Sequence, residues 1–487
     1  MVQQSVQRKR MKTTEEGSKG GHNDLGKEAL RRKSNLFDRK EALNGKLRSY
    51  KIRMYPTAAQ KGKLRMWYAA SNRAYNSALD IVKGMPAKAN LIQVRKRVVP
   101  KESIPYDQRW VEKVPSKIRA RAVKQLVDAQ HLNLKEKGFG NFKMRYRSYR
   151  KDPKGTIILE KAFARDNGPL HHFSSYDGRQ SSCKQKKHAL MYMAPSCFQE
   201  SENGILIQDR HWLIDKLLED GKLKEDGKIM WDKRTNRWYL IVLIDKEVKK
   251  KYSEAQDHDT KVVSLDPGVR SFNTFYSPDG SHGELLIGAT NVAMGMCKKM
   301  DKIRSDMDKI HENHKRDLQL MKEGGSEGGE QGSRIIGVTT YASHRSTLAH
   351  MRHRFHALSA RLRDWRTNAH YDAINFLLGR YNQVLIPEFQ SKRMAAKAER
   401  NISSQTVRRM FTMSHFMFRS RLIGKAELDE NKMVRVIGEP GTSKTCGNCG
   451  HWNSKLGGSK TYNCLNCGIV LDRDVNGARN NMLALIN

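Results

Sequence analysis

The sequence lacks any long hydrophobic run. No apolar stretch approaches the roughly 20 residues that a membrane-spanning helix needs, and the N-terminal region has no apolar segment of the kind found in secretory signals. We therefore predict an intracellular protein without a membrane partner.

Cysteine is also scarce. The chain has 7 cysteines in 487 residues, and four of them form one tight pattern near the C-terminus. Such usage argues against a disulfide-stabilised secreted protein and favours a metal site in a reducing compartment. Cys183 and Cys197 follow no metal-binding spacing, and we interpret them as ordinary thiols.

Acidic residues are in deficit. The 51 Asp and Glu residues are outnumbered by 91 Lys and Arg, which gives a formal net charge of +40. Such a surplus of one sign repels itself, so a polyanionic partner is the economical explanation. Because the basic residues are spread along the chain, the pattern favours extended contact with a nucleic-acid backbone.

Residues 1–48 are polar, glycine-rich and basic, which predicts a disordered arm. The arm contains two basic clusters, Arg8–Arg10 and Arg31–Lys33. These clusters fit a nuclear-import signal and fit equally a solvated tail that holds RNA without specificity. Both interpretations stay open at this point.

The region after the arm predicts a strand, then helices, then more strands. An alternating strand covers residues 49–56, and Thr57 is placed to cap the following helix. A second helix begins near Pro115, with Arg119 among the basic residues that lie off its apolar stripe. From about residue 139 the pattern turns to strands.

Aromatic and basic residues alternate in part of this strand-rich region. Phe142–Arg147 is one such segment, and Lys228–Trp231 and Trp238–Val242 flank a polar turn as in a hairpin. Strands of this composition suit a small barrel that lies on nucleic acid. An ordinary sheet with one solvated face is the other interpretation.

Asp266 follows a short apolar run, Val262–Leu265, and is itself followed by a Pro-Gly turn. This pattern predicts a buried strand with a carboxylate at its end. Glu388, Glu439 and Asp474 follow later strand or helix signals. Carboxylates at element ends are what a two-metal phosphodiester hydrolase needs, because their hard oxygens hold two Mg²⁺ ions about 4 Å apart.

Two CxxC motifs near the C-terminus are separated by fourteen residues, and a glycine follows each motif and allows a tight turn. Four thiolates around a tetrahedral Zn²⁺ make a closed structural site with no open position for water. The predicted ligands of one structural Zn²⁺ are Cys446, Cys449, Cys464 and Cys467.

Together these features resemble the TnpB/Fanzor family of transposon-encoded, RNA-guided DNA endonucleases, relatives of the type V CRISPR effectors. Ser264–Val269 is similar to the family's first RuvC motif. Thr442–Cys446, which leads into the cysteine pattern, and Asp474–Ala478 are similar to its third. Arg53–Thr57 and Arg73–Asn76 resemble its opening strand and first recognition helix.

The resemblance spans about residues 50–487 and implies a multidomain α/β fold. Its core is a RuvC (RNase H-like) nuclease domain with an inserted zinc ribbon, preceded by a wedge-like β-barrel and a helical recognition module. The implied boundaries are 49–56 and 138–255 for the barrel, 57–137 for the helical module, 256–445 and 469–487 for the nuclease domain, and 446–468 for the ribbon.

One departure from the family's prokaryotic pattern concerns the second carboxylate. In that pattern a Glu ends a strand seven residues before a Met, and the matching position before Met394 is Pro387, which cannot ligate a metal. Glu388 is one place further on, and neighbouring strand positions point to opposite faces. In the eukaryotic Fanzor branch, another Glu just before the Thr-Ser of the ribbon replaces the lost one, and here it is Glu439.

The resemblance therefore implies that Asp266, Glu439 and Asp474 are the catalytic Mg²⁺ ligands. Glu388 is the rival for the second place. Asp472 is a weaker rival for the third, since only Asp474 precedes the Asn476–Ala478 context. The residues implied in nucleic-acid binding are Arg53, Tyr55, Gln60, Arg73, Asn76 and Arg119.

The implied function is cleavage of double-stranded DNA directed by a transposon-encoded omega RNA and a short flanking motif. The resemblance further implies a monomeric ribonucleoprotein in the nucleus of a eukaryote, or of the host of a eukaryotic virus. Two other functions stay open: a guided or unguided DNA-binding protein that does not cleave, and a transposase that joins strands itself.

Overall fold

The computed structural model describes residues 46–159, 172–176, 188–192, 204–208, 226–246, 248–249, 261–323, 330–396, 402–438, 444–454, 456–457 and 459–483. Several predictions lie outside these residues: nearly all of the N-terminal arm, the two ordinary cysteines Cys183 and Cys197, and Glu439. None of the described helices combines the length and the hydropathy that a membrane span requires.

The first sheet is antiparallel and has seven strands, in the order β2-β6-β7-β1-β5-β4-β3. Its strands are β1 (Lys46–Tyr55), β2 (Lys154–Leu159), β3 (His172–Tyr176), β4 (His188–Tyr192), β5 (Ile205–Gln208), β6 (Gly227–Asp232) and β7 (Arg237–Lys246). The predicted opening strand is β1, which lies between β7 and β5. Among the described residues no pairing joins β2 to β3, so the described sheet is open where a barrel was predicted.

The predicted hairpin is confirmed, and one predicted strand is wrong. In the β6–β7 hairpin, Trp231 faces Trp238 with the ring centroids 5.2 Å apart. The segment Phe142–Arg147 is not in a strand. Asn76 instead takes both backbone hydrogen bonds of Arg147: Oδ1 accepts from its N–H at 2.8 Å, and Nδ2 donates to its carbonyl at 2.9 Å. The alternation of aromatic and basic side chains predicted a strand here, but it carries no information on whether a neighbouring strand pairs with this described segment.

Three helices accompany this sheet: α2 (Ala58–Val82), α3 (Leu91–Val98) and α4 (Ser116–Lys137). Thr57 caps α2 as predicted, in a capping box with Gln60. Arg119 corrects the sequence interpretation of α4, because it is 4% exposed rather than part of a solvated basic face. Its Nη1 donates to the Val99 carbonyl at 2.6 Å, a long-range contact that helical periodicity cannot reveal.

The second sheet is mixed and carries the predicted site, in the order β10-β9-β8-β11-β12. Its strands are β8 (Val262–Pro267), β9 (Asn273–Tyr276), β10 (His282–Leu285), β11 (Gln383–Pro387) and β12 (Met433–Ile437). Strands β8, β11 and β12 are parallel, whereas β9 and β10 pair antiparallel. Pro387 pairs with Ile437, so the two strands that precede Glu388 and Glu439 are neighbours, as expected.

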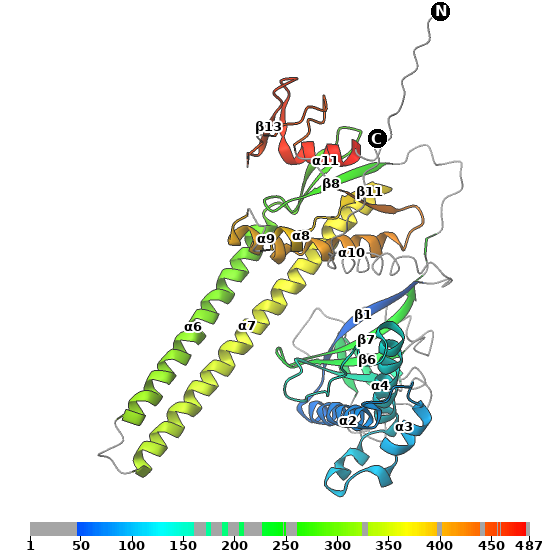
Figure 1. The fold of residues 1–487 in the computed structure, drawn as a ribbon, viewed down its shortest axis with the longest axis vertical. Coiled ribbons are helices and arrows are strands. Elements are labelled where there is room, and N and C mark those ends of the chain that lie inside the picture. The colour runs from blue at the N-terminus through cyan, green and yellow to red at the C-terminus, as the bar shows by residue number, and fades with distance from the viewer. Residues whose placement is uncertain are drawn as a thin grey trace, which may run out of the picture. The chain divides into compact units, whose positions relative to one another are not determined.

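Two long helices lie between β10 and β11 in the chain, and several short elements complete the region. Helices α6 (Ala289–Glu323) and α7 (Glu330–Arg380) run side by side (Figure 1). The remaining elements are α8 (Ser391–Met394), α9 (Ser404–Met413), α10 (His415–Ala426), β13 (Thr461–Asn463), β14 (Val470–Asp472) and α11 (Arg473–Leu483). Helix α11 packs against β8 and β9, which brings the last helix to the strand of Asp266 (Figure 1).

Candidate active site and metal centre

Asp266 lies near the end of β8, where helix α11 approaches it closely. A Cβ atom added at Gly477 would lie 2.5 Å from Asp266 Oδ2 and 3.1 Å from its Cγ. One residue before Asp266, the Leu265 carbonyl accepts a hydrogen bond from Asn481 Nδ2 at 2.9 Å. The Asp266 carboxylate therefore rests directly on the bare backbone of α11, in a space that only glycine leaves open.

Asp474 lies in the first turn of the same helix. It precedes Gly477 by three residues, so the two positions share one face of α11. Asp474 therefore lies on the face of α11 that meets Asp266 at Gly477. Asp266 and Asp474 are two of the three carboxylates that the resemblance implies for one site, and their shared role as metal ligands stays a prediction.

The environment of Asp474 is unfavourable for an uncompensated negative charge. Its side chain is 16% exposed, and burial raises the pKa of its carboxyl group, an effect that the nearby Arg473 opposes. A cation at this corner would favour the charged form. The carboxylate oxygens of Asp266 and the partly buried Asp474 fit Mg²⁺, which prefers oxygen ligands.

Asp472 has a different role in the structure. Its Oδ1 accepts hydrogen bonds from the backbone N–H groups of Asp474, at 2.8 Å, and Val475, at 3.2 Å. This is the geometry of a side-chain cap, which satisfies free donors at the start of a helix. The geometry favours Asp474 over Asp472 as the third carboxylate.

Glu388 follows β11, and its backbone N–H donates to the Ile437 carbonyl at 3.2 Å. Its Oε2 accepts a hydrogen bond from Gln390 Nε2 at 3.1 Å, and the intervening Phe389 has a left-handed φ of 40°. In the part of the chain that the structure describes, carboxylate oxygens of Glu388, Asp266 and Asp474 do not all lie within 4.8 Å of one another. The choice between Glu388 and Glu439 stays a prediction, because Glu439 is outside the described residues.

The four predicted cysteine ligands do converge. Their sulfur atoms all lie within 4.8 Å of one another, with Cys446–Cys467 at 3.7 Å and Cys449–Cys464 at 3.5 Å. A tetrahedral Zn²⁺ with Zn–S bonds of about 2.3 Å places its sulfurs about 3.8 Å apart. These separations fit a zinc ion and are far longer than a disulfide bond.

Backbone and side-chain donors surround the sulfurs. The His451 N–H lowers the pKa of the Cys449 thiol to about 6, and burial raises that of Cys446 to about 11. Asn466 Nδ2 donates to Cys449 Sγ at 3.6 Å. The glycines at 450 and 468 have φ values of 72° and 70°, which confirms the predicted tight turns. Zinc would hold all four groups as thiolates.

Asparagines of α11, which the sequence interpretation missed, connect the two centres. Asn476 Oδ1 accepts from the Gly447 N–H at 2.8 Å, and its Nδ2 donates to the Thr445 carbonyl at 2.7 Å. Asn480 Nδ2 donates to the same carbonyl at 2.7 Å. Asparagine is a poor helix former, so three buried ones (with Asn481) in an eleven-residue helix were a usable signal of long-range hydrogen bonds.

Two histidines lie behind the sheet, around Phe272. Its ring is stacked on those of His370, at 5.2 Å, and His415, at 4.8 Å. Burial lowers the pKa of His370 to about 4 and that of His415 to about 3, so both are neutral at pH 7. They are packing groups rather than metal ligands in this arrangement.

The predicted nucleic-acid residues make separate sets of contacts. Tyr55 is 40% exposed, and the Arg53 guanidinium lies 5.6 Å from its ring. Gln60 is 2% exposed and serves the α2 cap. Arg73 Nε donates to Gln108 Oε1. Binding of nucleic acid by these residues, and by Asn76 and Arg119, stays a prediction.

Two family models match the chain. The model described as a helix-turn-helix domain matches residues 46–85, which form β1 and α2 here, and the model described as Cas12f1-like, TNB domain, matches residues 415–481. The putative transposase A625R of Paramecium bursaria Chlorella virus 1 is 26% identical over 448 residues, 90% of this chain and 86% of that protein. TnpB-like protein L79 of Acanthamoeba polyphaga mimivirus is 24% identical over 89% of this chain and 72% of that protein.

Over about 90% of its length the chain is thus similar to a putative transposase and to a TnpB-like protein. This confirms the resemblance found in the sequence motifs. The second model covers the segment from α10 to α11, which holds all four cysteines and Asp474. Among solved structures, the Cas12f1–sgRNA–target DNA complex is similar with a TM-score of 0.46 and 13% identity, over 90% of this chain and 99% of that one.

Proposed function

We propose that this protein is an RNA-guided DNA endonuclease of the TnpB/Fanzor family that hydrolyses phosphodiester bonds with two Mg²⁺ ions. The observation that carries the proposal is the close approach of α11 to Asp266 at Gly477, three residues after Asp474 on the same helix. The similarity to these relatives and the net charge of +40 support nucleic acid as the substrate and as the guide.

When bound at this corner, Mg²⁺ ions would activate water and stabilise the leaving oxygen of the scissile phosphate. Asp266 and Asp474 would hold them from two sides, and Glu439 would supply the second carboxylate, with Glu388 as its rival. Asn481 holds α11 against β8, and Asp472 fixes the start of the helix, so both keep the two aspartates together.

The four cysteines would hold one Zn²⁺ in a closed structural site. Through Asn476 and Asn480, the ribbon they form is hydrogen-bonded to the helix that carries Asp474. The ribbon would therefore keep the third carboxylate in place as well as contact nucleic acid.

The proposed partners are an omega RNA that guides the protein and a double-stranded DNA target with a short flanking motif. Tyr55, exposed beside Arg53, is the side chain best placed to read that motif. We further propose the eukaryotic Fanzor branch, nuclear localisation and a monomeric ribonucleoprotein.

A guided DNA-binding protein without cleavage is the second candidate. It is favoured by Pro387 at the usual glutamate position and by the failure of Glu388 to group with Asp266 and Asp474 among the described residues. Such a protein would bind the same guide RNA and target DNA but would not cleave the DNA.

One experiment separates these functions. RNA that copurifies with the protein is sequenced, its guide segment is replaced by a chosen sequence, and a plasmid with the matching target is incubated with the complex and Mg²⁺. The proposal expects cutting at the new target only. Guide-dependent binding without a cut would support the second candidate, and defined cutting by protein without protected RNA would contradict RNA guidance.

A further inference from the structure

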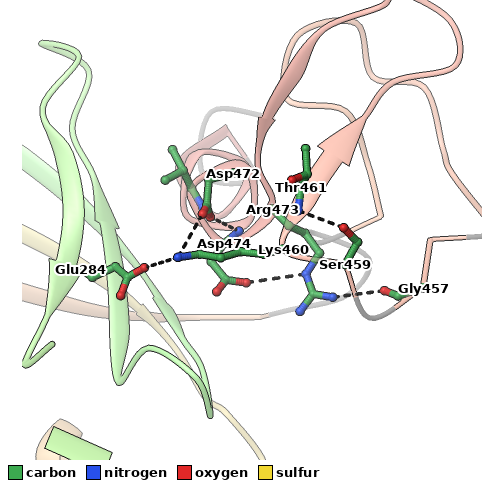
Figure 2. A network of polar contacts seen from close by, with 9 residues as sticks. Glu284, Gly457, Ser459, Lys460, Thr461, Asp472, Arg473 and Asp474 are labelled. Carbon is green, nitrogen blue, oxygen red and sulfur yellow. Dashed lines mark hydrogen bonds and ion pairs between the residues drawn. The ribbon is translucent and has the colours of Figure 1, made fainter. Parts of the chain in front are cut away.

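The zinc ribbon reaches the edge of the nuclease sheet through Lys460, which lies just before β13. Its Nζ is 2.7 Å from Glu284 Oε1 on β10 and 3.6 Å from Asp472 Oδ2 (Figure 2). Lys460 lowers the pKa of Glu284 through this hydrogen bond, so the pair is ionised at neutral pH. One lysine therefore joins the ribbon, the sheet and the residue that caps α11.

Arg473 connects the same ribbon segment to Asp474. Its backbone N–H donates to the Lys460 carbonyl at 2.7 Å, and its Nη1 donates to the Gly457 carbonyl at 3.2 Å. Its Nε lies 3.6 Å from Asp474 Oδ1 (Figure 2). That separation is too long for a hydrogen bond, so charge attracts the two groups while the Gly457 carbonyl restrains the guanidinium.

This restraint suits a carboxylate that must bind a metal ion. A free arginine beside Asp474 could form a bidentate pair and occupy both carboxylate oxygens. Because Gly457 holds the guanidinium back, Asp474 receives a compensating charge and keeps oxygen lone pairs for a ligand. Outer groups that orient a metal ligand in this way commonly determine its affinity.

We propose that Arg473 is a positioning residue for Asp474 and that Lys460 holds in place the ribbon segment that restrains Arg473. Through these two residues the zinc ribbon sets the affinity of the nuclease site for divalent cations. The inference rests on the proposed function, because it takes Asp474 as a ligand of the catalytic cations. It adds a coupling between a structural centre and a hydrolytic one.

The coupling can be separated from folding of the ribbon. Asn476 and Asn480 tie the cysteine knuckle to α11 independently of Lys460, through the backbone of Thr445 and Gly447. Lys460 itself is a surface group, 53% exposed. The substitution Lys460→Met should therefore leave the zinc content and the fold intact.

The test uses the full chain with its copurified RNA and takes Fe²⁺ as the probe. Fe²⁺ in a carboxylate site, with ascorbate and peroxide, cuts the polypeptide next to its ligands. The Fe²⁺ concentration for half-maximal scission beside Asp266 is measured for the wild type, Lys460→Met, Arg473→Ala and Arg473→Lys. Lys444→Met is the matched control, because Lys444 is another ribbon lysine and its Nζ lies over Trp452, 5.7 Å from the ring centroid.

We expect Lys460→Met and Arg473→Ala to raise this concentration about tenfold, with zinc content unchanged. Arg473→Lys should recover part of the affinity, Lys444→Met should match the wild type, and removal of zinc from the wild type should mimic Lys460→Met. Wild-type values for both Lys460→Met and Arg473→Ala would overturn the inference.

A separate variant distinguishes this failure from failure of the proposed function. Asp266→Asn should abolish scission beside position 266. If it does, and Lys460→Met still matches the wild type, only the coupling is wrong. If scission persists in Asp266→Asn, the cation site itself is wrongly placed.

Discussion

The zinc centre and the carboxylate site differ in how much of the chain each one needs. All four cysteines come from residues 446–467, and short turns alone bring their sulfurs together. The proposed carboxylate site needs Asp266 on β8 and Asp474 on the last helix, and the missing side chain of Gly477 lets that helix approach Asp266. The cysteine cluster can thus be encoded by a short segment, whereas the proposed carboxylate site depends on packing between distant elements.

Removal of the second carboxylate is the largest perturbation of the long-range site. Glu439→Ala should lower the rate of guided DNA cleavage by more than about 100-fold, since even outer-shell changes at metal sites cost 10–100-fold. Glu388→Ala should change the rate little, because Glu388 is not grouped with the aspartates in the described structure. Both variants are assayed bound to guide and target. Full activity in Glu439→Ala together with loss in Glu388→Ala would reverse the assignment.

Gly477→Ala tests the contact that makes the two distant carboxylates one site. The new Cβ would lie 2.5 Å from Asp266 Oδ2, so the carboxylate must move. Cleavage should fall about 10- to 100-fold, although alanine favours the helix by about 1 kcal/mol over glycine. The cleavage rate and the unfolding midpoint are measured together. Gly379→Ala is the control, since an added Cβ there meets nothing within 4 Å.

Cys464→Ser addresses the local centre. With only three cysteine ligands left, the protein should lose its one zinc ion, and elemental analysis measures this loss directly. Cleavage should fall less steeply than in Gly477→Ala, because Asn481 still holds α11 to β8. Unchanged zinc would show that the ligand set is wrong. Cys297→Ser, in the buried region near α9, should keep its zinc.

The next prediction concerns folding stability rather than cleavage: the histidines around Phe272 should make the unfolding midpoint depend on pH. Their pKa values, about 4 for His370 and about 3 for His415, lie below the ordinary 6.5, so the unfolded chain takes up protons first as pH falls. Stability is therefore full above pH 6.5 and drops toward pH 4, by up to about 1.4 kcal/mol per pH unit for each histidine. Unfolding midpoints at pH 7 and pH 5 measure this.

His415→Phe should remove one of the two contributions and flatten the pH dependence of the midpoint. The exposed His282 provides the control, because His282→Gln should leave the dependence unchanged. An identical pH dependence in wild type and His415→Phe would contradict the account of a neutral, buried His415.

Local patterns predicted a large part of this fold. The apolar run Val262–Leu265 lies in β8, and Asp266 lies at the predicted strand end. The two CxxC motifs predicted the sulfur cluster because ligand spacing and turn glycines are properties of short segments.

What the sequence could not predict depends on partners far along the chain. Arg119 was expected at the surface and is buried by a hydrogen bond to Val99, twenty residues before it. Lys460 and Glu284 carry no motif, yet they meet across the ribbon and the sheet. A charge cluster or an apolar stripe in the sequence shows only which residues are close along the chain. These contacts depend on which residues are close in space.

The central claim is that Asp266 and Asp474 form one metal-dependent cleavage site. The most direct measurement is the rate of guided plasmid cleavage by Asp266→Asn and Asp474→Asn, each shown to keep its RNA and its zinc. Asp279→Asn, in the exposed turn between β9 and β10, is the matched control for loss of one negative charge. The account predicts loss of cleavage by more than about 100-fold in both site variants and wild-type cleavage in the control. Wild-type cleavage by either site variant would contradict it.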